Sequence, residues 1–187
     1  MTSTHLSRCN PEEDAPLTGY FLPAPSGQAE QTLILLHGWG ANAQDLMPIV
    51  PSLNLPNLQA FCPNATFSYP AMPGGRMWYV LGPQLEFDLD PDGIANSGRA
   101  IAALVEHLAQ TTGIPSTQTV IAGFSQGGAM ALDVGSRLPI AGLVSMSGYL
   151  HALLDPQTVC PKPALVLHGS LDPVVSIAAG RQAQQQL

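Results

Sequence analysis

The sequence predicts an α/β domain built on a mostly parallel sheet with helices on both faces. Two observations carry this prediction. Short apolar runs alternate with longer amphipathic runs, which is the pattern of repeated βα units. The apolar runs are hydrophobic throughout, as expected for strands covered on both faces. A length of 187 residues suits one domain, so we expect a loose polar segment over residues 1–15 and a single domain over residues 16–187.

The expected elements follow the apolar runs in chain order. The candidate strands are residues 17–22, 33–36, 58–62, 119–122, 143–146 and 164–167. The clearest helix covers residues 92–110, because Ile101, Leu104 and Leu108 lie on one face at helical spacing, and Gly113 ends it. Two further helices are expected over residues 126–137 and 175–187.

The composition restricts the partners. Six Lys and Arg stand against 13 Asp and Glu, for a net charge of −7, which argues against nucleic acid and anionic lipid as partners because both need clustered basic side chains. No apolar stretch is long enough for stable membrane insertion, and the N-terminus has no apolar signal-peptide core. Cys9, Cys62 and Cys160 are odd in number and lack C-x-x-C spacing, so we expect free thiols in the reducing cytoplasm.

The sequence Gly-Phe-Ser-Gln-Gly-Gly at residues 123–128 carries the strongest chemical signal. It directly follows a candidate strand and opens a candidate helix, which is the context of a G-x-S-x-G nucleophile elbow. Glycine on either side of the serine lets the strand and the helix approach without Cβ clashes. Ser125 is therefore the candidate nucleophile.

Three other motifs agree with this elbow. In chain order, these motifs are Leu-His-Gly-Trp-Gly at 36–40, Gly-Arg-Met-Trp-Tyr at 75–79 and, after the elbow, Leu-His-Gly-Ser-Leu-Asp-Pro-Val-Val at 167–175. On these motifs the chain resembles, over roughly residues 17–187, the phospholipase/carboxylesterase family of α/β-hydrolases, which includes acyl-protein thioesterases. The resemblance implies an α/β-hydrolase fold and a serine hydrolase acting on small carboxylic esters or acyl thioesters.

Each part of the expected site has a candidate residue. The backbone N–H of Gln126, directly after the nucleophile, should bind the oxyanion, and the resemblance implies that Trp39 supplies the second N–H. Asp172 follows a later strand, where this fold places the carboxylate that orients the base. The alternative for Asp172 is a turn-forming role before Pro173. With one imidazole between them, the Ser125 hydroxyl and the Asp172 carboxylate should lie about 6–9 Å apart.

The base is the missing part. In this fold it follows the acid, beyond one more helix and strand, but residues 173–187 contain no His. We therefore expect the C-terminal strand and helix of the fold to be absent, and hydrolysis to be impaired. His151 and His168 are the candidate substitutes, whereas His37 precedes the oxyanion loop and is expected to satisfy backbone groups.

Residues 63–91 are rich in Pro, Gly and aromatic side chains and show no clear period. A loop this long in a compact domain is usually functional, so Trp78 and Tyr79 are expected to line the substrate cleft. The alternative is a surface excursion capped by its own aromatic residues.

The competing function is a catalytically silent hydrolase remnant that binds an acyl ligand or a protein partner. An incomplete sheet would leave an unpaired edge, which makes self-association possible. Residues 38–43 also fit a dinucleotide fingerprint, but no acidic residue follows the next strand to bind a ribose. No spacing of His or Cys suggests a metal, and no cofactor is expected.

Overall fold

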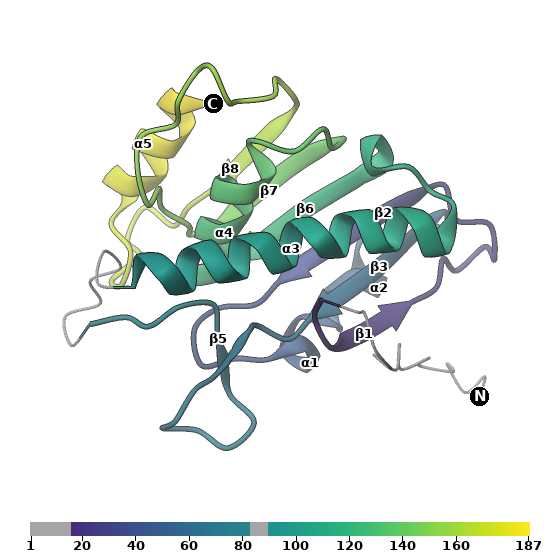
Figure 1. The fold of residues 1–187 in the computed structure, drawn as a ribbon, viewed down its shortest axis with the longest axis horizontal. Helices are drawn as coiled ribbons and strands as arrows, with labels where there is room; N and C mark the ends of the chain where they lie inside the picture. Colours follow the sequence, from purple (N-terminus) through teal and green to yellow (C-terminus); the bar gives the residue numbers. More distant parts are fainter. Residues whose placement is uncertain (1–15, 83–89) are drawn as a thin grey trace.

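The computed structural model describes residues 16–82 and 90–187. Six strands form one sheet in the order β1-β3-β2-β6-β7-β8 (Figure 1), and β4 and β5 form a two-stranded sheet of their own. Neighbours in the large sheet are parallel, except that β1 runs antiparallel to β3. The strands are β1 (Gly19–Leu22), β2 (Gln31–Leu36), β3 (Leu58–Pro63), β4 (Phe67–Ser68), β5 (Arg76–Met77), β6 (Thr119–Phe124), β7 (Gly142–Met146) and β8 (Ala164–Leu167).

Helices cover both faces of the sheet. They are α1 (Ala43–Leu46), α2 (Ile49–Ser52), α3 (Pro91–Thr112), α4 (Gln126–Gly135) and α5 (Ile177–Gln186), with a 3₁₀ turn at Ser116–Gln118. Ile34 and Leu36 of β2 point toward α3 and α4, whereas Leu33 and Leu35 point toward α1. On the α4 side, Ala183 of α5 joins the core next to β7. The predicted α/β architecture is confirmed.

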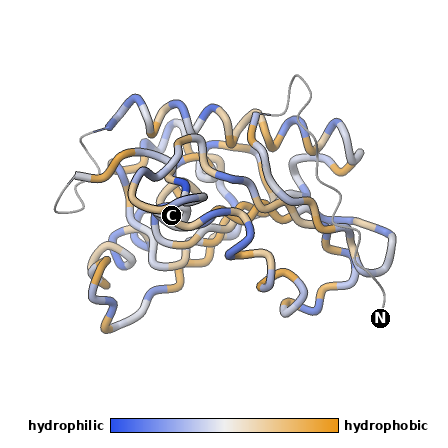
Figure 2. Tube along the Cα trace, turned by 90° about the horizontal axis from the view of Figure 1, so that it is seen from below, coloured by the Kyte–Doolittle hydropathy of each residue, from blue (hydrophilic) through white to orange (hydrophobic). Residues whose placement is uncertain are grey.

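Hydrophobic residues gather in the strands at the middle of the molecule, and the long helix alternates between hydrophobic and hydrophilic residues along its length (Figure 2). The largest core cluster lies between the sheet and the inward face of α3, which supplies Ile101, Leu104, Val105 and Leu108. This stripe agrees with the helical spacing read from the sequence.

Local signals fix the ends of α3. The Asp90 carboxylate accepts the Gly93 N–H at 3.0 Å before Pro91 opens the helix. At the other end Gly113 adopts a left-handed φ of 76° and donates its N–H to the Ala109 carbonyl, which closes the helix.

The structure adds elements that periodicity did not predict. Within the stretch 63–91, β4 and β5 form a short hairpin, and the four-residue helices α1 and α2 follow β2. The expectations for residues 1–15 and 83–89 fall outside the described residues. Within the two described ranges, no helix is long and apolar enough to cross a membrane.

Candidate active site

Ser125 lies on a sharp turn between β6 and α4. Its backbone has φ 52° and ψ −115°, a conformation that L-residues rarely adopt. The Ser125 N–H donates to the Met146 carbonyl of β7 at 2.8 Å, and the Ala129 N–H donates to the Ser125 carbonyl at 3.0 Å. These bonds join the turn to the sheet on one side and to the helix on the other.

Glycine is required on both sides of this turn. A Cβ at Gly123 would overlap the Gly127 carbonyl, and a Cβ at Gly127 would overlap the Leu36 and His37 carbonyl oxygens. The elbow is therefore pressed against the end of β2, where the loop of residues 37–41 begins.

His37 stabilises this loop. Its ring is fully buried, with Nδ1 2.7 Å from the Gly38 carbonyl, and Nε2 accepts the Ala65 N–H at 3.0 Å. Since Nε2 is an acceptor, Nδ1 is the donor, and the imidazole is neutral. Burial lowers the pKa of His37, despite the opposing effect of the Gly38 carbonyl and the Asp45 charge. Both ring nitrogens serve the backbone, as the sequence led us to expect.

Trp39 follows on the same loop and remains partly open to solvent, with 36% of its surface exposed. Its indole packs against Tyr69, with ring centroids 4.7 Å apart. Gly40 adopts a φ of 76°, which lets the chain turn back toward β5 directly after Trp39.

The structure places Trp78 and Tyr79 in the core instead of the cleft wall, because both are fully buried. The Trp78 indole N–H donates to the His37 carbonyl at 2.9 Å. The Tyr79 hydroxyl lies 2.6 Å from the Tyr149 hydroxyl. Trp78 and Tyr79 thus belong to the core cluster that packs against α3 and α4.

Asp172 lies in the loop after β8. One of its carboxylate oxygens accepts the N–H groups of Val174 and Val175, each at 2.9 Å. These bonds hold the pKa of Asp172 below its ordinary value, and the bond from Val175 has the larger effect. A hydrogen bond from the Ser147 hydroxyl lowers the pKa of Asp172 further. Backbone bonds of this kind also form a turn, so this geometry is compatible with both expected roles.

Ser147 is a residue that the sequence analysis did not single out. It directly follows β7 as Ser125 directly follows β6, with a φ of 50°, and its N–H donates to the Leu167 carbonyl at 2.8 Å. Because β6, β7 and β8 are parallel neighbours, Ser125, Ser147 and Asp172 follow the carboxyl ends of three adjacent strands. The backbones of β6 and β8 are two strand spacings apart, or roughly 9–10 Å.

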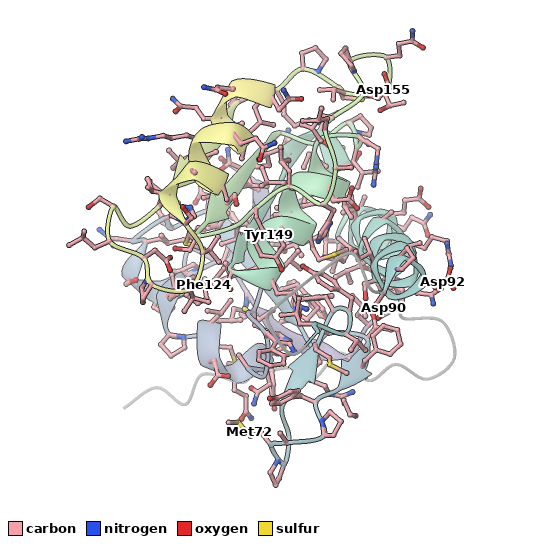
Figure 3. The ribbon with its side chains drawn as sticks, turned by 90° about the vertical axis from the view of Figure 1, so that its left-hand side faces the viewer. Met72, Asp90, Asp92, Phe124, Tyr149 and Asp155 are labelled. Carbon is pink, nitrogen blue, oxygen red and sulfur yellow. The ribbon has the colours of Figure 1, made fainter. Side chains whose placement is uncertain are left out.

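A depression of about 220 Å³ opens beside Ser125. Figure 3 labels Tyr149 and Phe124, which precedes Ser125, below α5 in that view. The depression is lined by Trp39, Leu81, Ser125, Gln126, Tyr149, Val174, Val175, Ser176 and Ala179. The sequence pointed to three of these residues, whereas Leu81, Tyr149 and the start of α5 come together only in the fold.

The two candidate substitute bases have other partners. His151 Nε2 lies 2.8 Å from the Tyr79 hydroxyl, and burial lowers the pKa of His151 to about 4. His168 Nε2 lies 2.8 Å from the Val175 carbonyl, so this nitrogen carries the proton, and 3.8 Å from Asp172. His168 Nδ1 faces α5, because a Cβ at Gly180 would lie 2.6 Å from it.

Comparison with known proteins gives one consistent result. The sequence profile described as Phospholipase/Carboxylesterase matches residues 18–187. Acyl-protein thioesterase 1 of Saccharomyces cerevisiae is 32% identical, over 90% of this chain and 82% of its own. The crystal structure of esterase PE8 superposes with a TM-score of 0.84 at 31% identity, covering 91% of this chain and 82% of that one. Zea mays acyl-protein thioesterase 2 shares the fold, with a TM-score of 0.63 at 22% identity, over 90% and 84% of the two chains. This chain therefore belongs to the phospholipase/carboxylesterase family of α/β-hydrolases.

Proposed function

We propose that the chain hydrolyses small carboxylic esters or acyl thioesters through a covalent acyl-serine. The observation that carries this proposal is Ser125, in strained backbone between β6 and α4 and facing the 220 Å³ depression. A nucleophile on such a turn reaches substrate without steric hindrance from its neighbours. The relatives' names, esterase and acyl-protein thioesterase, support the same substrate class.

In the proposed reaction the Ser125 oxygen attacks the acyl carbonyl carbon and its proton passes to a base. The N–H groups of Gln126 and Trp39 stabilise the oxyanion. Collapse breaks the ester or thioester bond, and the alkoxide or thiolate leaves with a proton. Water then hydrolyses the acyl-serine and restores the hydroxyl. Asp172 is the group that would orient an imidazole base.

Within these 187 residues we propose that the reaction is slow. No His follows Asp172, and His37, His151 and His168 are engaged with other groups. A base whose pKa is about 4, as for His151, removes a serine proton poorly. In a well-studied protease, loss of a triad member leaves a rate roughly 10³- to 10⁴-fold above that of the reaction in water. We expect a rate enhancement of this order at most.

Covalent labelling tests the nucleophile directly. A fluorophosphonate should label the wild-type chain at one site and should not label Ser125→Ala. Ser170→Ala removes an exposed serine from the loop after β8 and is the matched control, so its labelling should equal that of the wild type. Equal labelling of Ser125→Ala and the wild type would refute the assignment.

The second candidate is a silent remnant that binds an acyl ligand or a protein partner. The engaged histidines favour it, since they leave Ser125 without a base among the described residues. Time courses with p-nitrophenyl acetate separate the two functions. Continued release of nitrophenol that depends on Ser125 supports the hydrolase, whereas saturable binding of the ester without release supports the remnant.

We also propose that a second copy pairs with the β8 edge. β8 is the last strand of the sheet in the described part of the chain, and Leu165 and Leu167 are 50% and 48% exposed. Unpaired edges with apolar side chains favour strand addition. A concentration-dependent increase in mass by light scattering, abolished in Leu165→Lys, is the expected result.

For location we propose the cytoplasm. The support is that Cys62 and Cys160 are free thiols in the described structure, as is usual in a reducing compartment. Cell fractionation tests this proposal.

A further inference from the structure

One short segment joins the two halves of the proposed oxyanion site. This segment, residues 75–79, is called the brace from here on; it touches the loop of residues 37–41 at one end and the elbow at the other. We propose that Trp78 is a positioning residue, which holds the backbone N–H groups of Trp39 and Gln126 at a fixed separation. The inference rests on the proposed function. It adds the side chains of Trp78 and Gln126, neither of which touches substrate.

The sheet alone does not hold the loop. The ladder between β2 and β6 ends at the pair Leu36–Gly123, and the chain leaves the sheet at His37. Beyond this point the brace takes over. The Gly40 N–H donates to the Arg76 carbonyl at 2.9 Å, and the Arg76 N–H donates to the Ala41 carbonyl at 2.8 Å.

Close packing accompanies these bonds. A Cβ at Gly75 would lie 2.7 Å from the Gly40 carbonyl oxygen, so a glycine is needed where the brace meets the loop. The Trp78 indole then reaches across to the His37 carbonyl at 2.9 Å. Trp39 is thus flanked by hydrogen bonds at His37 and at Gly40.

At its other end the brace is bound by a side chain of the elbow. The side-chain amide oxygen of Gln126 accepts the backbone N–H of Trp78 at 2.9 Å. The side-chain amide nitrogen donates to the Tyr79 carbonyl at 2.8 Å. The side chain thereby satisfies one donor and one acceptor of the brace, as a neighbouring strand would. Gln126 is 1% exposed, so water does not compete for these groups.

The centre of the brace is fixed as well. Trp78 has no exposed surface, and its carbonyl accepts a hydrogen bond from the Ser97 hydroxyl of α3. The centroids of its ring and of the His37 ring lie 5.5 Å apart. Because Trp78 is buried and all its polar groups are bonded, a shift of its backbone or ring also shifts the groups that it contacts. A displacement of 1 Å at a reacting centre costs about a hundredfold in rate.

Amide hydrogen exchange tests the brace without substrate. Trp78→Phe keeps an aromatic ring in the core, removes the bond to His37 and leaves a small cavity beside it. It should speed exchange in residues 37–41 about tenfold, as expected for the loss of one buried hydrogen bond. Gln126→Met, which breaks the elbow end, should speed exchange of the Trp78 amide by a similar factor.

Tyr79→Phe is the matched control. It also removes one buried polar group from the same segment, but that hydroxyl bonds Tyr149 and His151 and leaves the brace intact. Exchange in residues 37–41 should stay at the wild-type rate in this variant. Equal acceleration in Trp78→Phe and Tyr79→Phe, or none in Trp78→Phe, would overturn the inference.

Kinetics give a second readout. With p-nitrophenyl acetate, Trp78→Phe should lower kcat tenfold or more and leave KM within twofold, because a misplaced donor weakens the transition state more than substrate binding. A loss shared equally between kcat and KM would argue against positioning. If the wild-type chain proves inactive, the proposed function fails, and the exchange comparison still decides the brace.

Discussion

The two sides of the candidate site differ in how firmly they are built. The nucleophile side, with the elbow and the loop of residues 37–41, is bound by backbone bonds, by the Gln126 side chain and by a fully buried Trp78. The acid side, after β8, is open: Leu171 is 91% exposed and Val174 65%.

This difference separates two requirements of acyl transfer. Oxyanion donors act through fixed geometry and must be preorganised before substrate arrives. A carboxylate that orients an imidazole depends on a partner, and in the described structure Asp172 is held mainly by its own turn. The candidate site therefore combines a rigid nucleophile side, where the oxyanion is proposed to bind, with a weakly supported candidate acid. Four predictions test this contrast, beginning with the largest expected effect.

Glycine replacement should separate the two sides most strongly. At Gly127 a Cβ would overlap two backbone carbonyls, so Gly127→Ala should destabilise the protein by more than about 4 kcal/mol. At Gly169, on the acid side, the closest atom to a Cβ would be 3.7 Å away. Gly169→Ala should change stability by less than about 0.5 kcal/mol. Urea unfolding measures both, and similar losses would contradict the contrast.

Leucine truncation at the last residue of two strands gives the second test. Leu36 of β2 is fully buried, whereas Leu167 of β8 is 48% exposed. Leu36→Ala should cost about 2–5 kcal/mol of unfolding free energy through lost burial and the cavity left behind. Leu167→Ala should cost about 1 kcal/mol or less. Calorimetry compares the two, and equal costs would mean that β8 is covered in solution.

A pH titration of stability tests His151, which contacts Tyr79 of the brace. Burial lowers the pKa of His151 from 6.5 to about 4, so the unfolded chain binds its proton first as the pH falls. Stability should therefore drop by about 3 kcal/mol between pH 6.5 and pH 4. His151→Gln cannot titrate and should flatten this part of the curve. An unchanged slope would show that His151 is not buried in solution.

The smallest effect is expected at Asp172. Its pKa lies below the ordinary 3.8, so its contribution to stability is present above that value and is lost only as the pH falls through the lower, folded-state pKa. Ser147→Ala removes one of the three hydrogen bonds and should move the pKa of Asp172 upward toward 3.8. Carboxyl NMR titration measures this shift, and an unchanged pKa would exclude Ser147 as a partner.

The elements that the sequence predicted well have local sequence signals. The elbow needs glycine at positions 123 and 127 because backbone would collide with any side chain there. The long helix α3 carries its apolar stripe, its Asp90 cap and its Gly113 stop in consecutive sequence. The signal for each of these features stands in neighbouring residues of the chain, although the backbone that excludes a side chain at Gly127 belongs to Leu36 and His37.

Features that depend on distant partners were out of reach. Gln126 bonds a residue 48 positions away, and the buried position of Trp78 depends on the His37 carbonyl and on α3. The irregular, aromatic-rich stretch therefore suggested that Trp78 and Tyr79 line a cleft, whereas both belong to the core. Helix α1 was missed for another reason: its capping box at Asn42 and Asp45 is visible in the sequence, but four residues show no period.

The two roles of Gln126 affect how a mutational scan of this protein reads. Every residue except proline keeps the backbone N–H at position 126, so the group proposed to bind the oxyanion survives almost any substitution. The side chain, in contrast, is lost in all of them. If substitutions at position 126 abolish activity, the cause would be the loss of the side-chain bonds to residues 78 and 79. The location beside the nucleophile would nevertheless suggest a direct chemical role. A residue can thus be indispensable to a reaction through atoms that never meet the substrate.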